Sequence, residues 1–232
     1  MACGGDVRRG IGTARVELCW PEEMDTSGSE LRGYVMPRLK PEFYFDVQVK
    51  GRRRRVERSL DWAVSTRSAF TIPFSVTSED RLELVRLISR WLASMHDEDL
   101  VYGDLSWKNI AFTTSPEVRV SIFDFDSTRL IGARSFTGQQ AVHTIDWEDP
   151  AVSEGPPTLD SDRFRFALLA FRLLVSGDLN ASIDPNAVAR GLQGLHDTDI
   201  HRLSRLWRRA CGPSGTRPTL VEWCVALGVS DC

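Results

Sequence analysis

The sequence predicts an α+β fold, with a small β part followed by a mainly helical C-terminal part. Short segments at 14–20 and 31–36 alternate apolar and polar residues, which is typical of strands. Two longer segments, 77–96 and 159–174, carry apolar residues at helical spacing over wide faces. A chain of 232 residues can bury a substantial core, either as one domain or as a small two-lobed unit.

The composition excludes several classes of protein. A formal net charge of -3 gives no global basic surface, so we expect no clear nucleic-acid binding. No apolar stretch approaches the roughly 18 residues of a membrane helix, so we expect no membrane attachment. The five cysteines are scattered and form no C-x-x-C pair, which favours a reduced protein in the cytoplasm.

The first part of the chain is expected to form a β-hairpin. Its strands are 14–20 and 31–36, the polar residues between them form the turn, and residues 1–13 make a poorly ordered start. Farther along, the pattern at 59–64 predicts a short helix. The basic run 50–55 either meets a phosphate or acidic partner or is a solvated face.

The two long helices have recognisable starts. Thr77 with Asp80 is suited to cap the first helix, whose wide apolar face needs burial on two sides. In the second, Ser161 or Asp162 is expected to cap the start, and apolar residues lie nearly all round. This helix is therefore predicted to be central.

Two shorter helices are predicted near the end of the chain. The segment 199–211 has an amphipathic helical pattern, and the residues that follow it break the helix. Thr219 and Glu222 form a capping box before a last helix at 223–227.

The candidate functional residues lie in two stretches, 101–109 and 122–127. Asp104 is on a loop after an apolar approach, and Asn109 follows five residues later. Two apolar runs then form a predicted hairpin that ends at Asp124 and folds this residue back toward Asn109. A carboxylate beside a substrate hydroxyl, plus an amide and a carboxylate on a hard cation, suits phosphoryl transfer with Mg2+. The alternative is that these acids only cap turns.

Both stretches resemble known kinase segments. The run from Asp104 to Asn109 is similar to the catalytic loop of protein kinases, and 124–126 is similar to their Asp-Phe-Gly segment, with Asp126 replacing the glycine. The wording Gly-Asp-Leu-Ser at 103–106 most resembles a group of bacterial protein kinase-like proteins, which have the eukaryotic-type Ser/Thr kinase fold.

The resemblance extends over roughly residues 31–230. Gly33–Arg38 resembles the end of a kinase small lobe entering the hinge. The resemblance implies a protein kinase-like fold, in which 1–37 is the remnant of a truncated small lobe and 38–232 is a mainly helical large lobe. It also implies ATP and Mg2+ as cofactors and a protein substrate or regulatory protein as partner.

The same resemblance implies roles for individual residues. Asp104 corresponds to the catalytic base, and Lys108 is placed to neutralise the transferred phosphate. Asn109 and Asp124 correspond to metal ligands, and Asp126 is either a third metal-side carboxylate or a turn former. The residues that the resemblance places against the adenine at the hinge are Met36 and Leu39.

Two supporting contacts follow from the resemblance as well. Asp162 is expected to hold the backbone of the catalytic-type loop by accepting its N–H groups. Arg217 is expected to pair with an acid of the preceding segment, and either Glu148 or Asp149 can serve.

One departure from the family affects function. A complete kinase has a glycine-rich loop, a strand lysine and a helix glutamate before the hinge, whereas no lysine precedes Lys40 in this chain. We therefore keep three hypotheses: a phosphotransferase acting on Ser or Thr hydroxyls, a pseudokinase that acts as a binding or scaffold module, and a small-molecule kinase of the aminoglycoside type.

Overall fold

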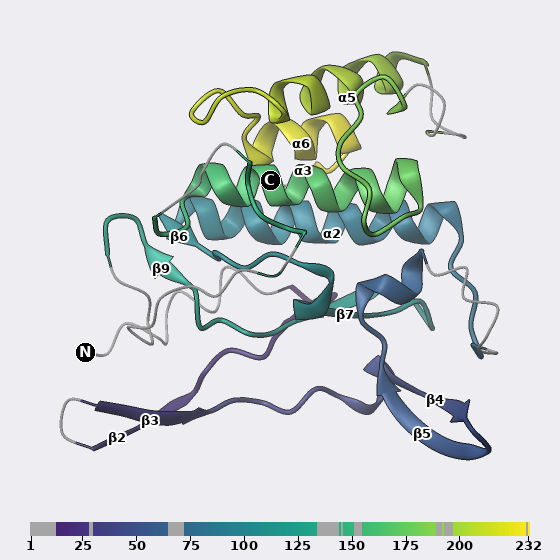
Figure 1. Cartoon of the computed structure of the whole chain (residues 1–232), viewed down its shortest axis with the longest axis vertical. Helices are drawn as coiled ribbons and strands as arrows, with labels where there is room; N and C mark the ends of the chain where they lie inside the picture. The colour runs from purple at the N-terminus through teal and green to yellow at the C-terminus, as the bar shows by residue number, and fades with distance from the viewer. Residues whose placement is uncertain are drawn as a thin grey trace.

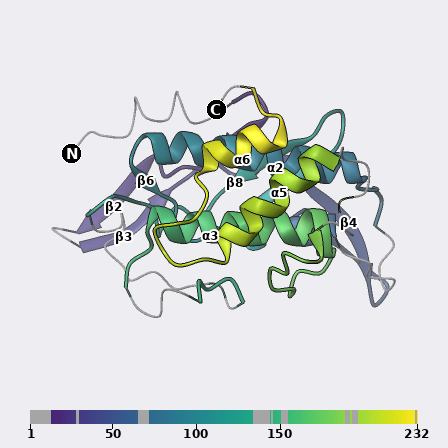
Figure 2. The same cartoon turned by 90° about the horizontal axis from the view of Figure 1, so that it is seen from above.

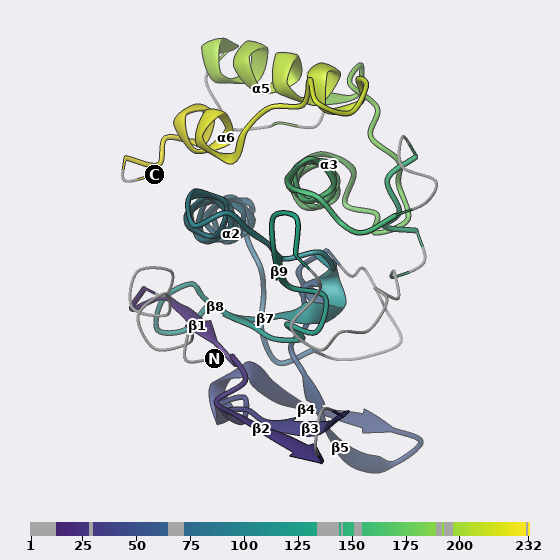
Figure 3. The same ribbon diagram turned by 90° about the vertical axis from the view of Figure 1, so that its left-hand side faces the viewer.

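The computed structural model describes residues 13–27, 30–64, 72–133, 144, 146–150, 155–188, 192, 197–230 and 232. The fold is α+β, as predicted from the sequence. Helices lie on one side of the molecule and strands on the other (Figure 3). The main helices are α2 (Ser78–Asp97), α3 (Leu159–Phe171), α5 (Asp197–Ala210) and α6 (Leu220–Leu227).

The ends of the helices follow local capping chemistry. Thr77 and Asp80 form the predicted capping box of α2, and Thr219 with Glu222 forms that of α6. The cap predicted for α3 is confirmed only in part, because Ser161 belongs to the capping box but the N-cap residue is Thr158. Thr158 caps this helix, because its hydroxyl accepts the N–H of Ser161 at 3.1 Å while the Ser161 hydroxyl receives the N–H of Thr158 at 2.8 Å. The Asp162 side chain takes no part in this capping box.

A three-stranded sheet supports the centre of the molecule. Strands β7 (Ile110–Thr113) and β8 (Arg119–Ile122) pair antiparallel, which confirms the predicted hairpin. The free edge of β8 is taken by β1 (Val16–Leu18), which runs parallel to it. The predicted pairing of 14–20 with 31–36 is therefore wrong.

The second predicted strand pairs with a nearer segment. β3 (Glu30–Val35) is antiparallel to β2 (Glu23–Ser27), which lies in the stretch expected to be a polar turn. A partner a few residues away closes a much shorter loop than β1 could, so ordering the chain costs less entropy. A hairpin forms as predicted, but with a different first strand.

The basic run belongs to another hairpin. β4 (Tyr44–Val49) and β5 (Arg52–Glu57) pair antiparallel, and the turn residues Lys50 and Gly51 have φ of 50° and 74°, as a tight two-residue turn requires. The arginines at 52–55 are exposed, which agrees with a solvated face. The β2–β3 and β4–β5 hairpins lie at opposite ends of the molecule (Figure 2).

Shorter elements complete the chain. The segment predicted as a short helix at 59–64 contains the 3-10 helix η2 (Leu60–Ala63). Strands β6 (Leu100–Val101) and β9 (Arg129–Leu130) pair antiparallel. Helix α3 continues into a π-helical turn, η4 (Arg172–Ser176). The remaining 3-10 turns are η1 (Pro41–Phe43) and η3 (Trp107–Asn109).

The core lies around α2 and α3, which run side by side (Figure 1). Both contribute large side chains that are almost fully buried, including Trp91 on α2 and Phe166 on α3. Phe166 contacts Trp223 of α6 edge to face, with ring centroids 5.6 Å apart. Trp207 of α5 donates its indole N–H to the carbonyl of Ala167 at 2.9 Å. The central position predicted for α3 is confirmed.

Several sequence expectations meet the structure only in part. Residues 1–12 of the expected disordered start lie outside the described residues. The boundary at residue 37 stays a prediction, although β1 joins the first segment to the sheet of the second by backbone hydrogen bonds. No helix in the described ranges combines the length and the apolar character needed to cross a membrane.

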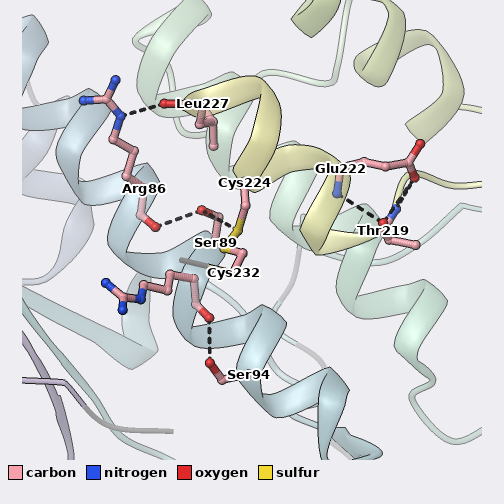
Figure 4. The surroundings of a disulfide bond; sticks show 9 residues. Arg86, Ser89, Ser94, Thr219, Glu222, Cys224, Leu227 and Cys232 are labelled. Carbon is pink, nitrogen blue, oxygen red and sulfur yellow. Dashed lines mark hydrogen bonds between the residues drawn. A yellow bond between two sulfur atoms is a disulfide. The ribbon is translucent and has the colours of Figure 1, made fainter. Parts of the chain in front are cut away.

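The expectation of five reduced cysteines is wrong. Cys224, which is buried on α6, forms a disulfide with Cys232 (Figure 4). Next to it, Arg86 of α2 donates to the carbonyl of Leu227 at 2.8 Å, so the end of α6 is attached to α2 as well. Disulfides are rare in reducing compartments, and a cytoplasmic location therefore stays a prediction.

The packing of α2 gives a stability prediction. Leu92 is fully buried, whereas Leu130 on β9 is 47% exposed. We expect Leu92→Ala to lower the free energy of unfolding by about 2–5 kcal/mol, because it leaves a cavity in the core. The matched change Leu130→Ala should cost about 0.5 kcal/mol or less. Urea titration followed by tryptophan fluorescence measures both, and equal effects would contradict the described core.

Candidate functional site

We call residues 102–109, which carry Asp104, the Asp104 loop. This loop is held in place by α3. Asp162 is fully buried, and its carboxylate accepts the backbone N–H of Tyr102 at 2.8 Å and that of Gly103 at 2.9 Å. His96, at the end of α2, lies 3.4 Å from the same carboxylate. The role predicted for Asp162 is thus confirmed.

Gly103 makes this attachment possible. Its φ of 87° is a left-handed conformation that favours glycine, and a Cβ here would lie 2.9 Å from the carbonyl oxygen of Ser127. The carbonyl of Gly103 accepts a hydrogen bond from Arg165, a buried residue one turn along α3 from Asp162. Sequence reasoning missed Arg165, because an arginine in an apolar helix carries no sign of its backbone partner.

Asp104 and Asn109 lie together, as the spacing predicted. The amide nitrogen of Asn109 donates to the carbonyl oxygen of Asp104 at 2.8 Å and to its carboxylate at 2.9 Å. The second carboxylate oxygen of Asp104 lies 3.3 Å from the hydroxyl of Thr144. The Asp104 carboxylate is therefore oriented from within its own loop and remains within reach of a hydroxyl group.

Asp124 reaches the same place from the end of β8. The N–H of Phe123 donates to the carbonyl of Asn109 at 3.1 Å, which joins this strand end to the Asp104 loop. Asp124 itself has a φ of 62°, an uncommon conformation for a residue with a side chain. Such backbone strain is found preferentially at functional sites.

The electrostatics show that three carboxylates gather here. The pKa of Asp124 is raised, first by burial and then by the negative charges of Asp126 and Asp104. A hydrogen bond from the backbone of Asp126 partly opposes this shift. Asp104, Asp124 and Asp126 thus form one acidic cluster, assembled from two separate stretches of the sequence.

Tyr34 is an unexpected member of the site. Its hydroxyl, carried by β3, donates to the carboxylate of Asp126. The pKa of Tyr34 is well above its usual range, chiefly through burial and then through this hydrogen bond. Because the bond spans 92 residues of sequence, no local pattern could have predicted it. The β2–β3 hairpin therefore extends to the acidic cluster.

The donor set suits a hard divalent cation. Carboxylate oxygens are preferred ligands of Mg2+, and mutual repulsion among the acidic cluster is the kind of strain that a cation relieves. Asp124 and Asp126 with Asn109 are the residues that would hold it. Among the described residues, no group of three or more His, Cys, Asp or Glu side chains lies so that it could hold a metal ion by itself.

The other predicted site residues are less clearly connected. Lys108 is exposed, and its ammonium lies 5.5 Å from the centroid of the Trp107 ring. Met36 is 37% exposed just after β3, and Leu39 is partly buried. The phosphate role of Lys108 and the adenine contacts of Met36 and Leu39 stay predictions.

Of the two acids predicted as partners of Arg217, Asp149 is the one that pairs with it. Both side chains are buried, and the guanidinium donates to both carboxylate oxygens, with one N–O distance of 2.6 Å. The alternative acid, Glu148, is exposed. Arg217 also donates to the carbonyl of Asp160 at 3.2 Å, near the start of α3.

The buried pair gives a second stability prediction. We expect Arg217→Ala to lower the free energy of unfolding by about 3–5 kcal/mol, because the buried Asp149 carboxylate loses the guanidinium that neutralises it. The matched change Arg209→Ala removes the exposed pair with Glu222 and should cost about 1 kcal/mol or less. Denaturant unfolding measures both. Equal losses would contradict a buried pair.

The raised pKa of Asp124 predicts a dependence of stability on pH. Below the ordinary aspartate pKa of about 3.9, folded and unfolded states are both protonated and no penalty exists. As pH rises through the raised folded pKa, charging the side chain costs stability. We therefore expect Asp124→Asn to raise the melting temperature at pH 7, by an amount that shrinks toward pH 4.

Differential scanning calorimetry at several pH values tests this expectation. Asp97→Asn, a change at an exposed position near the end of α2, is the control and should follow the wild-type pH profile. A variant Asp124→Asn that is less stable than the wild type at pH 7 would contradict the described repulsion.

Relatives offer no further guide to the site. No protein-family model matches the chain, and no curated protein matches it.

Proposed function

We propose that this protein is a phosphotransferase that moves the γ-phosphate of ATP to a Ser or Thr hydroxyl with Mg2+. The observation that carries the proposal is the acidic cluster, in which Asp104 lies beside Asn109 and close enough to Asp124 to raise its pKa. Phosphoryl transfer needs a proton acceptor at the nucleophile and oxygen ligands for the cation that binds the phosphates. These residue types supply both.

Each residue has a distinct part in this proposal. Asp104 accepts the proton of the attacking hydroxyl. The hydroxyl oxygen bonds to the γ-phosphorus while the bond from phosphorus to ADP breaks and ADP leaves. Asn109 orients the Asp104 carboxylate, and Asn109, Asp124 and Asp126 would hold the cation. Mg2+, when bound, neutralises the charge of the phosphate oxygens. Asp162 acts indirectly, because it positions the backbone next to Asp104.

We further propose that the fold is protein kinase-like. The order of a long helix, a loop with Asp and Asn, a strand ending in Asp, and a buried helix holding that loop supports this proposal. The buried pair of Arg217 with Asp149 supports it too. A protein acceptor belongs to the same proposal.

A binding module of the pseudokinase type is the second candidate, and the placement of lysines favours it. Lys40 pairs with Glu17 at 2.9 Å, Lys50 is exposed in the β4–β5 turn, and Lys108 lies over Trp107. All of the chain's lysines are described, and none is ion-paired with the acidic cluster. These contacts give none of the three lysines a place beside the residues that would hold the cation and its phosphates.

Nucleotide binding and phosphate transfer can be tested separately. We expect Mg-ATP to stabilise the wild type, by about 2.7 kcal/mol when its concentration is 100 times Kd. ATP with excess EDTA should have little effect. Asp124→Ala should remove the stabilisation, whereas Asp104→Asn should keep it and lose transfer of radiolabel from γ-labelled ATP to protein.

The control variant is Asp97→Asn, which should retain both properties. Stabilisation without transfer to protein or to small hydroxyl compounds would favour the binding module. Transfer only to an aminoglycoside would identify a small-molecule kinase. No stabilisation by Mg-ATP would contradict the phosphotransferase and favour a scaffold that does not bind the nucleotide.

A further inference from the structure

A cavity of about 500 Å³ lies apart from the acidic cluster. It is bordered by β6, by β9 and the residues after it, by the start of α3, and by the turn at 214–215. Its volume falls within the usual range for small-molecule sites, about 300–1,000 Å³. None of the residues assigned to phosphoryl transfer lines it.

Arg129 is the most unusual residue of this cavity. It is only 8% exposed, and burial lowers its pKa, because its cationic form has lost water. Its Nε lies 3.5 Å from the carbonyl of Ser127, which is at the limit of a hydrogen bond. Within the described part of the chain no carboxylate forms an ion pair with it. A buried guanidinium without a counter-charge is costly, and an anion would offset this cost.

A second arginine and one carboxylate lie on the same wall. Arg163 is 3.9 Å from one oxygen of Asp160, and Arg217 is 3.3 Å from the other. Neither Asp160 oxygen accepts a hydrogen bond in the described chain. Since Asp149 already neutralises Arg217, the described residues that line the cavity set Arg129 and Arg163 against Asp160 alone. The formal charge of this described lining is therefore positive.

The rest of the wall is apolar. Val101, Ile131, Leu159 and the adjacent Pro156–Pro157 are among its lining residues, together with the smaller Thr158 and Ser214. The cavity also touches the N-terminal turn of α3, where the helix dipole favours negative charge. A strongly hydrated anion such as phosphate gains nothing from apolar walls, whereas an anion on an apolar body uses both parts.

We propose that this cavity binds a small organic monocarboxylate, with the carboxylate at Arg129 and Arg163 and the apolar body against the proline and aliphatic wall. An arginine matches a carboxylate with paired, charge-assisted hydrogen bonds. The apolar part is held by loss of its contact with water. This site is independent of the proposed phosphotransferase.

Isothermal titration with octanoate tests the proposal, and octanol and inorganic phosphate separate the two parts of recognition. Octanoate should bind at least tenfold more tightly than either compound. Ser214→Trp, at the exposed turn that borders the cavity, should abolish binding by filling the space while both arginines remain. Arg129→Gln and Arg163→Gln should each weaken octanoate binding about tenfold and leave octanol binding unchanged.

Arg208→Gln, on the exposed face of α5, is the matched control and should bind octanoate as the wild type does. Unfolding curves for every variant identify any that fail to fold, and Arg163→Gln with Ser214→Trp then decides the result. Undetectable octanoate binding, equal binding of octanol, tighter binding of phosphate, or binding that persists in Ser214→Trp would each overturn the proposal.

Discussion

The site depends on one buried carboxylate. Asp162 satisfies two consecutive backbone N–H groups of the Asp104 loop, and no water is needed to do so. An unpaired buried N–H costs about 1–3 kcal/mol, so losing this single side chain would destabilise the closed loop by that amount for each of the two groups. Arg165 holds the carbonyl of the same glycine, and the loop is thereby fixed through both kinds of backbone group.

The acidic cluster, by contrast, destabilises the folded state. Asp124 combines a left-handed backbone with a carboxylate placed near two others, and both features disfavour the folded state. Folded proteins keep such conflicts mainly where a ligand resolves them. The stable attachment of the Asp104 loop to α3 and the strained acidic cluster are therefore complementary. The attachment keeps the loop in place while the cluster stays in a conformation that a ligand would favour.

Local sequence patterns predicted much of this structure, whereas few of its long-range pairings could be predicted. The capping boxes of α2 and α6 and the hairpin of β7 with β8 depend on residues close in sequence, and all were predicted correctly. The contact of Tyr34 with Asp126 and the parallel pairing of β1 depend on segments far apart, and neither could be derived. The pair of Arg217 and Asp149 was accessible only through a family resemblance.

The parallel pairing of β1 has a consequence for how the chain is made. Val16 can pair with Val120 only after about 100 further residues have been synthesised. At about 5–20 residues per second, the interval is on the order of 5–20 s on the ribosome. During that time the early strand has an open edge and no sheet to join. Chaperones, or a transient partner, have their best opportunity to engage the nascent chain in this interval.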